Sequence, residues 1–209
     1  MVVDKRNMPC HDKNRGFSLI EVLVAMIIIL VALLGIAALQ GRAQVAELES
    51  QQRAMALILL SDIADKMIAN KQTLSCFAFT TNAGTGTPYI GVGLIVDGHA
   101  AAPACAASIA AYNTRANAAL NEIDALLEGA AETASGANVG GMIGARACIN
   151  YDAAKELAGQ PGTGLFTVAV SWQGMADLVT PSATCAKDLY GTEEKRRTVS
   201  TTMRMADLL

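Results

Sequence analysis

One acidic residue, Glu21, lies in an apolar run of 23 residues that extends from Phe17 to Leu39. A carboxylate in a membrane-type helix is costly unless a cation or a hydrogen-bond donor pairs with it. In one interpretation, Ser18 and Glu21 form a capping box, in which the serine caps the helix and the glutamate bonds back to the serine amide. In a second, compatible interpretation, Glu21 belongs to a functional site.

The residues around this run indicate a membrane segment that is retained in the mature protein. About 20 apolar residues span a bilayer core. Basic residues precede the run: Lys5, Arg6, Lys13 and Arg15. By the positive-inside rule the leader is therefore cytoplasmic and the C-terminal part is exported. A secretory signal would end in a small-residue cleavage site after a shorter apolar run, whereas here the glycine, Gly16, comes before the run.

Five cysteines bear on the redox environment. Cys10 precedes the apolar run, and Cys76, Cys105, Cys148 and Cys185 follow it. Four cysteines in an exported domain are typical of two disulfides, with three possible connectivities. Free thiols would suit a cytosolic protein, and the spacings do not fit a zinc site.

Catalytic chemistry is poorly supported by the sequence. Of the two histidines, His11 lies in the leader, and His99 follows Asp97 in a Gly/Ala-rich segment that we interpret as a solvated loop rather than a metal site. Residues 195–197 (Lys-Arg-Arg) are interpreted as a solvated turn. They would neutralise few phosphates, and the net charge of −3 disfavours a nucleic-acid-binding surface. We expect no enzyme activity and no metal.

Two helices should position these residues. Residues 17–70 contain no proline and no glycine after Gly41, which predicts one long helix. Its second half has apolar residues at helical spacing, on a face expected to pack on the exported domain: Val45, Leu48, Met55, Leu59, Ile63 and Met67. A second helix is predicted over residues 104–128, ending at Gly129, with its own apolar series: Ile109, Tyr112, Ala116, Leu120, Ile123 and Leu127.

The other segments are predicted to be loops and strands. Residues 71–103 and 130–142 are expected to be loops, with a short strand near Tyr89–Val96. Three strand-like runs, of which the second and third alternate with period two, predict antiparallel strands at residues 143–151, 165–172 and 197–205. Trp172 should cover the core of their sheet. The chain is therefore predicted to be α+β, with a long N-terminal helix packed on a small antiparallel β-sheet domain that carries an additional helix.

The segment RGFSLIEVLVA, residues 15–25, resembles the class III signal of type IV prepilins and type II secretion pseudopilins. The resemblance implies that a prepilin peptidase cuts after Gly16 and methylates the new N-terminus, Phe17. It also implies that Glu21 neutralises the N-terminal amine of a neighbouring subunit in the helical core of a filament. The methyl donor and the metal of processing belong to the peptidase, so no cofactor is expected in this chain.

The later sequence narrows the resemblance to the PilV group of type IV pilus modification proteins. The matching segments are QQRAMALILLSDIADKMIANK, VAVSWQG and the stretch from Cys185 through Tyr190-Gly191 to Arg196-Arg197. On this resemblance we expect Cys148 to pair with Cys185, and Cys76 with Cys105. The implied layout is a cleaved leader (1–16), a transmembrane and filament-core helix (17–40), its amphipathic continuation (41–70) and an exported α+β domain (71–209).

The implied function is that of a minor pilin, a structural subunit that primes or decorates a type IV pilus in adhesion, twitching motility or DNA uptake. Its partners would be prepilin peptidase, other minor pilins, the major pilin and the inner-membrane assembly platform, with no specific nucleic acid. It would cross the inner membrane once before assembly and lie in the surface pilus afterwards. The alternatives are a minor pseudopilin of a type II secretion system and, from another class, a signal-anchored periplasmic enzyme or binding module.

Overall fold

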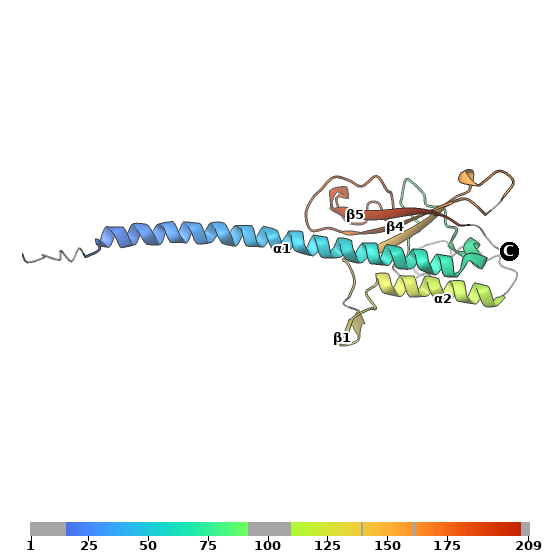
Figure 1. The fold of residues 1–209 in the computed structure, drawn as a ribbon, viewed down its shortest axis with the longest axis horizontal. Helices are drawn as coiled ribbons and strands as arrows, with labels where there is room; N and C mark the ends of the chain where they lie inside the picture. Colours follow the sequence, from blue (N-terminus) through green and yellow to red (C-terminus); the bar gives the residue numbers. More distant parts are fainter. Residues whose placement is uncertain (1–15, 92–109, 139, 161, 206–209) are drawn as a thin grey trace, which may run out of the picture. The chain divides into compact units, whose positions relative to one another are not determined.

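The computed structural model describes residues 16–91, 110–138, 140–160 and 162–205. The chain divides into two compact units, one that ends at Val45 and one that begins at Ala46. The helix α1, Leu19–Ala69, begins in the first unit and ends in the second (Figure 1). The prediction of a single long helix is therefore confirmed.

In the second unit, α1 buries a narrow stripe of side chains. Ala56, Leu60, Ile63 and Met67 are buried at spacings of four, three and four residues. The predicted face is partly wrong: Ile63 and Met67 are buried, but Met55 is 47 % exposed. Successive side chains of a helix point about 100° apart, and the fully buried position is taken by the small Ala56, so the neighbouring methionine points away. Val45 and Leu48 are exposed as well.

Two further helices pack near the end of α1. The Asn70 side chain donates to the Lys66 carbonyl at 2.8 Å, and the 3₁₀ helix η1, Lys71–Phe77, follows where a loop was predicted. Helix α2, Ala110–Leu127, buries four residues of the predicted apolar series: Ala116, Leu120, Ile123 and Leu127. Gly129 follows with a φ of +85°, a conformation that favours glycine at the end of a helix.

The sheet consists of three antiparallel strands in the order β3-β4-β5: β3 Arg146–Asp152, β4 Leu165–Gln173 and β5 Arg196–Arg204. All three predicted strands are present, with ends shifted by a few residues. One face of the sheet packs on the helices and carries Phe166, Val168, Val170 and Trp172. Trp172 is 3 % exposed, as expected for a residue that covers the core. Together the elements form an α+β fold, as predicted.

Residues 79–90 lie along the outer edge of β3. Ile90 and Ala147 exchange two backbone hydrogen bonds, of 2.7 and 2.9 Å, and the Tyr151 amide donates to the Phe79 carbonyl at 2.9 Å. Of the strand predicted near Tyr89–Val96, Ile90 alone pairs among the described residues, and residues 92–96 lie outside them. The predicted loop 130–142 contains a small hairpin of β1, Thr133–Ala134, and β2, Ala137–Asn138.

Candidate functional site

The residues from Gly16 to Glu21 lead into the first turn of α1. The Ser18 carbonyl accepts hydrogen bonds from the amides of Glu21 at 3.0 Å and Val22 at 3.3 Å, so Ser18 marks the helix boundary. Glu21 lies in the first turn, where the partial positive charge of a helix N-terminus favours an anion. Among the described residues, no hydrogen bond of the kind a capping box requires joins the Ser18 side chain to α1.

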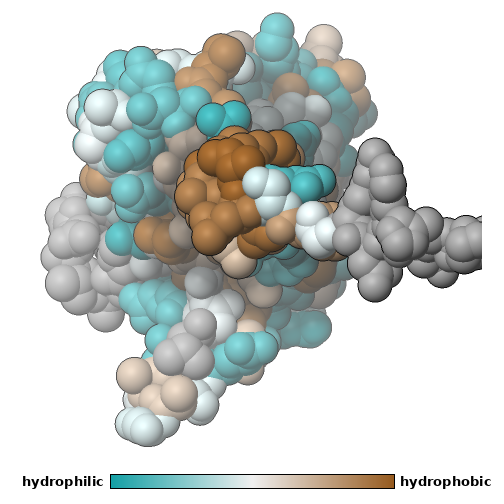
Figure 2. Space-filling view, turned by 90° about the vertical axis from the view of Figure 1, so that its left-hand side faces the viewer, coloured by the Kyte–Doolittle hydropathy of each residue, from teal (hydrophilic) through white to brown (hydrophobic). Residues whose placement is uncertain are grey.

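The helix that follows Glu21 exposes large apolar side chains around its whole circumference. Ile28, Val31, Leu34 and Leu39 are each more than half exposed, and Figure 2 shows the side chains at the near end of α1 as a mostly hydrophobic surface. α1 is long and apolar enough to cross a membrane. At roughly 25 cal/mol per Å² of apolar surface, burial in lipid or in a bundle of like helices is strongly favoured over water.

A comparison with protein families decides what this N-terminus is. Residues 11–37 match the prokaryotic N-terminal methylation motif. The chain has a prepilin-type N-terminus. The motif supports a type IV pilin-like protein, a structural protein anchored by its apolar helix, and implies processing by prepilin peptidase and pilus-type assembly partners. No curated protein and no solved structure matches the chain.

The match covers 27 of the 209 residues and does not reach the second unit. It therefore does not separate a pilin from a pseudopilin or identify the PilV group. Cleavage after Gly16, methylation of Phe17 and the assembly role of Glu21 remain predictions.

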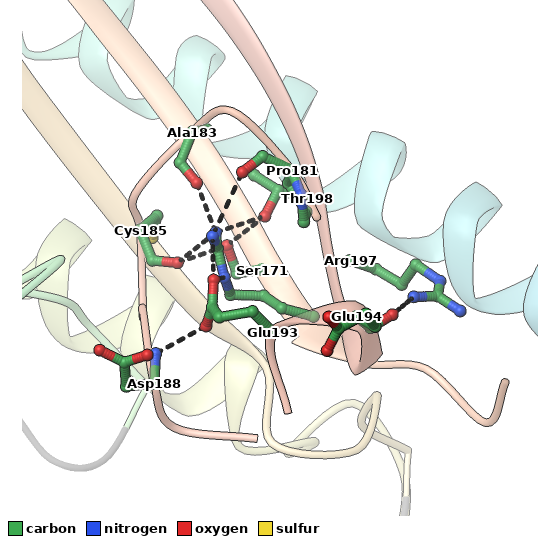
Figure 3. Close-up of polar contacts among 10 residues, drawn as sticks. Ser171, Pro181, Ala183, Cys185, Asp188, Glu193, Glu194, Arg197 and Thr198 are labelled. Atoms are coloured by element: carbon green, nitrogen blue, oxygen red, sulfur yellow. Dashed lines mark hydrogen bonds and ion pairs between the residues drawn. The ribbon is translucent and has the colours of Figure 1, made fainter. Parts of the chain in front are cut away.

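A second polar cluster, in the second unit, centres on Arg196. Its side chain is 2 % exposed and forms an ion pair with Glu193, whose Oε2 lies 2.6 Å from Nη2 (Figure 3). Arg196 also donates to the carbonyls of Pro181, Ala183 and Cys185. The guanidinium therefore holds the connection between β4 and β5 against the sheet.

The neighbouring Arg197 points to the opposite face of β5, toward α1. Its Nη2 lies 3.1 Å from Glu49 Oε1, and Glu49 also accepts the amides of Met175 and Ala176 at 3.0 Å each. The interpretation of residues 195–197 as a solvated turn was therefore wrong for both arginines. The long sequence separation of Glu49 and Arg197, 148 residues, left no local signal of this contact.

Burial acts against the ionised form of Glu193, but the hydrogen bonds from Arg196 and from the Asp188 amide outweigh it, so the pKa of Glu193 lies below its usual value. The carboxylate therefore remains ionised in mildly acidic solution. Because the Glu193 carboxylate is the one anion bonded to the Arg196 guanidinium among the described residues, its ionisation supports the whole loop.

The cysteine predictions have different outcomes. Cys148 on β3 and Cys185 in the β4–β5 connection form a disulfide, with their Cα atoms 5.7 Å apart. Gly86 packs against the same connection with a φ of +66°, and a Cβ there would lie 1.9 Å from the Thr184 carbonyl. Cys76 is buried and disulfide-bonded. Its predicted partner, Cys105, lies outside the described residues, so that pairing remains a prediction.

The described residues hold no group of three or more His, Cys, Asp or Glu side chains able to bind a metal ion. His11 and His99 lie outside these residues. The second unit carries two open grooves, of about 390 and 380 Å³. The first is lined by residues of α1, of the sheet and of the β4–β5 connection, and the second by residues of α1, of α2 and of the segments that flank the β1–β2 hairpin.

Proposed function

We propose that the chain is a minor pilin that takes part in type IV pilus assembly, of the PilV group, and that it primes or decorates the fibre. The observation that carries the proposal is one acid, Glu21, in the first turn of α1 and within the otherwise apolar run 17–39, behind a Gly-Phe pair. The match of residues 11–37 to the methylation motif supports it.

In this proposal the peptidase creates the partner of Glu21. Cutting after Gly16 frees an amine on Phe17, four residues before Glu21, or about one helical turn. Each subunit then brings one cation and one anion into an apolar bundle. Neighbours are stable where the two charges meet, because pairing removes two desolvation costs and so fixes the axial register of the helices.

The chain would then have four parts. Residues 1–16 are the removed leader, residues 17–40 cross the inner membrane and later form the filament core, and residues 41–70 continue that helix. Residues 71–209 form the exported domain, periplasmic before assembly and on the pilus afterwards. Adhesion, twitching motility and DNA uptake are the activities such a pilus would serve.

Mass spectrometry of the mature chain tests the proposal. We expect the first residue to be an N-methylated Phe17. An intact leader would contradict the proposal and favour a signal-anchored enzyme or binding module.

Deletion of the gene, followed by imaging of pili and measurement of secreted proteins, separates pilus from secretion. We expect fewer pili and normal secretion in the deletion strain. Normal pili with lost secretion would instead support a minor pseudopilin of a type II secretion system.

A further inference from the structure

The two outer edges of the sheet differ. In the order β3-β4-β5, the edge of β3 is covered by residues 79–90, whereas no described residue pairs with the outer edge of β5. A strand edge with free N–H and C=O groups is a template for another strand. Proteins protect such edges with short strands, prolines, bulges or charges.

The edge of β5 lacks these protective features over most of its length. Its register with β4 is unbroken from Arg196 to Arg204, and residues 198–203 (TVSTTM) contain no proline and no charge. The strand has nine residues, which is longer than a typical strand. The edge is therefore suited to pairing.

The hydrogen bonds of β4 show which groups point outward. The Gly174 amide donates to the Lys195 carbonyl at 2.7 Å, so the amide of Gly174 points toward β5. The backbone N–H and C=O groups of successive residues in a strand point to opposite sides. Two residues before Gly174, Trp172 therefore also directs these groups toward β5, where it pairs with Arg197. Alternate residues of β5 then direct N–H and C=O outward: Thr198, Ser200, Thr202 and Arg204.

We infer that the outer edge of β5 receives an extended strand from another pilin-type subunit, by β-strand addition. This inference rests on the proposed function, which supplies the other subunits. The open groups of four alternate residues complement an extended backbone. On the helix side of the sheet, the half-buried Val199 and Met203 would be covered by apolar side chains of the incoming strand. On the other side, hydroxyl groups favour polar ones, so the partner strand alternates apolar and polar residues.

The charges favour an acidic partner over a second copy of this chain. Residues 195–205 (KRRTVSTTMRM) contain four basic residues, of which Arg196 and Arg197 are paired with Glu193 and Glu49. Among the described residues, Lys195 and Arg204 have no acidic partner. Pairing β5 with itself would bring like charges to the same edge, which opposes association. A partner strand with acidic residues at its ends would complement Arg204 at one end of β5 and Lys195 at the other.

Amide hydrogen exchange of the full-length protein in detergent tests the inference. The probe is a synthetic octapeptide in which valine and threonine alternate between acidic ends. We expect exchange in residues 198–204 to slow about tenfold at a free peptide concentration of about ten times Kd. The same peptide with two adjacent central prolines, which remove a donor from each of its edges, should give no slowing.

A protein variant provides the second arm. Ser200→Pro removes an outward N–H that no described group accepts, and should abolish the slowing, whereas Ser200→Ala should retain it. If Ser200→Pro does not fold, the comparison of the Val/Thr peptide with the proline-containing peptide on the wild-type protein still tests the inference. No slowing with the Val/Thr peptide, or equal slowing with the proline peptide, overturns the inference.

Two other results would contradict the choice of an acidic partner strand. Slowing that depends on protein concentration without peptide would show that a second copy binds the edge, and equal slowing by a basic-ended peptide would refute the charge argument. This experiment needs neither processing nor assembly. Its failure is therefore distinguishable from failure of the proposed function, which is read from the mature N-terminus.

Discussion

At Arg196, three backbone carbonyls and one carboxylate surround a guanidinium that is 2 % exposed. The spacing of Glu193 and Arg196 predicts an ion pair from sequence. The burial of that pair was not predictable, because it depends on the carbonyls of residues 181–185, which the disulfide and the sheet place around the guanidinium. For Glu21, by contrast, the neighbouring sequence predicts a charged partner, but the proposed partner belongs to another subunit and so is not in this chain.

Replacing Arg196 should destabilise the second unit. Arg196→Met leaves the carbonyls of Pro181 and Ala183 and the Oε2 atom of Glu193 without a donor, at a cost of about 3 kcal/mol. The melting temperature in detergent should fall by about 6–12 °C. Lys195→Met is the matched control, because no described residue forms a side-chain hydrogen bond or ion pair with Lys195. An equal melting temperature for Arg196→Met and the wild type would contradict the prediction.

The lowered pKa of Glu193 predicts a stability loss in acid. Its folded pKa lies below the unfolded value of 4.5, so its contribution is present above pH 4.5 and disappears as pH falls through the folded pKa. The melting temperature of Glu193→Gln, measured from pH 6 downward, should therefore decrease less in acid than that of the wild type. Glu194→Gln should follow the wild type, since the Glu194 side chain is exposed. Parallel curves for all three proteins would refute the assignment.

Replacing Glu21 should separate processing from assembly. Glu21→Ala is expected to be cleaved after Gly16 and methylated normally, but to be recovered in pili at least about tenfold less, since each 1.4 kcal/mol lost is a factor of ten. Glu47→Ala, an exposed acid later on the same helix, is the control. Mass spectrometry and immunoblotting of sheared pili measure both quantities. Equal incorporation of Glu21→Ala would refute the charge-pairing role.

At the scale of the elements, regular patterns were predictable and long-range contacts were not. Period-two alternation located β4 and β5, a strand-like run located β3, and the lack of proline located α1. The buried stripe of α1 was displaced because Ala56, a small residue with little weight in an apolar pattern, occupies the closest contact. Glu49 and Arg197 were missed because their contact joins distant parts of the chain.

The Cys148–Cys185 disulfide joins β3 to the β4–β5 connection and closes a loop with a sequence separation of 37 residues. Replacing both cysteines with serine should lower the free energy of unfolding by about 2–4 kcal/mol and speed amide exchange in residues 181–190. Cys10→Ser, in the predicted leader, is the control. The melting temperature and exchange rates of the unprocessed full-length proteins in detergent measure the effect. Unchanged exchange in the connection would show that Arg196 holds it without the disulfide.

At the scale of the whole molecule, the composition changes where the two units meet. The sequence prediction ended the membrane segment at residue 40, and the contacts divide the chain between Val45 and Ala46. Among the described residues, all buried core residues, from Ala56 onward, belong to the second unit. The first unit has an apolar surface and no core of its own among the described residues, so its stability must come from lipid or from other subunits.

This division predicts that residues 46–209 fold without the first unit. Exported behind a cleavable secretory signal, they should form the Cys148–Cys185 disulfide and melt within a few degrees of the full chain, because every buried core side chain is retained. After alkaline extraction the shortened chain should be soluble, while the full chain stays with the membrane, held by its apolar helix. The full-length protein, prepared in parallel, is the control. A shortened chain that aggregates, or that lacks a cooperative melting transition, would show that residues before Ala46 contribute to the core.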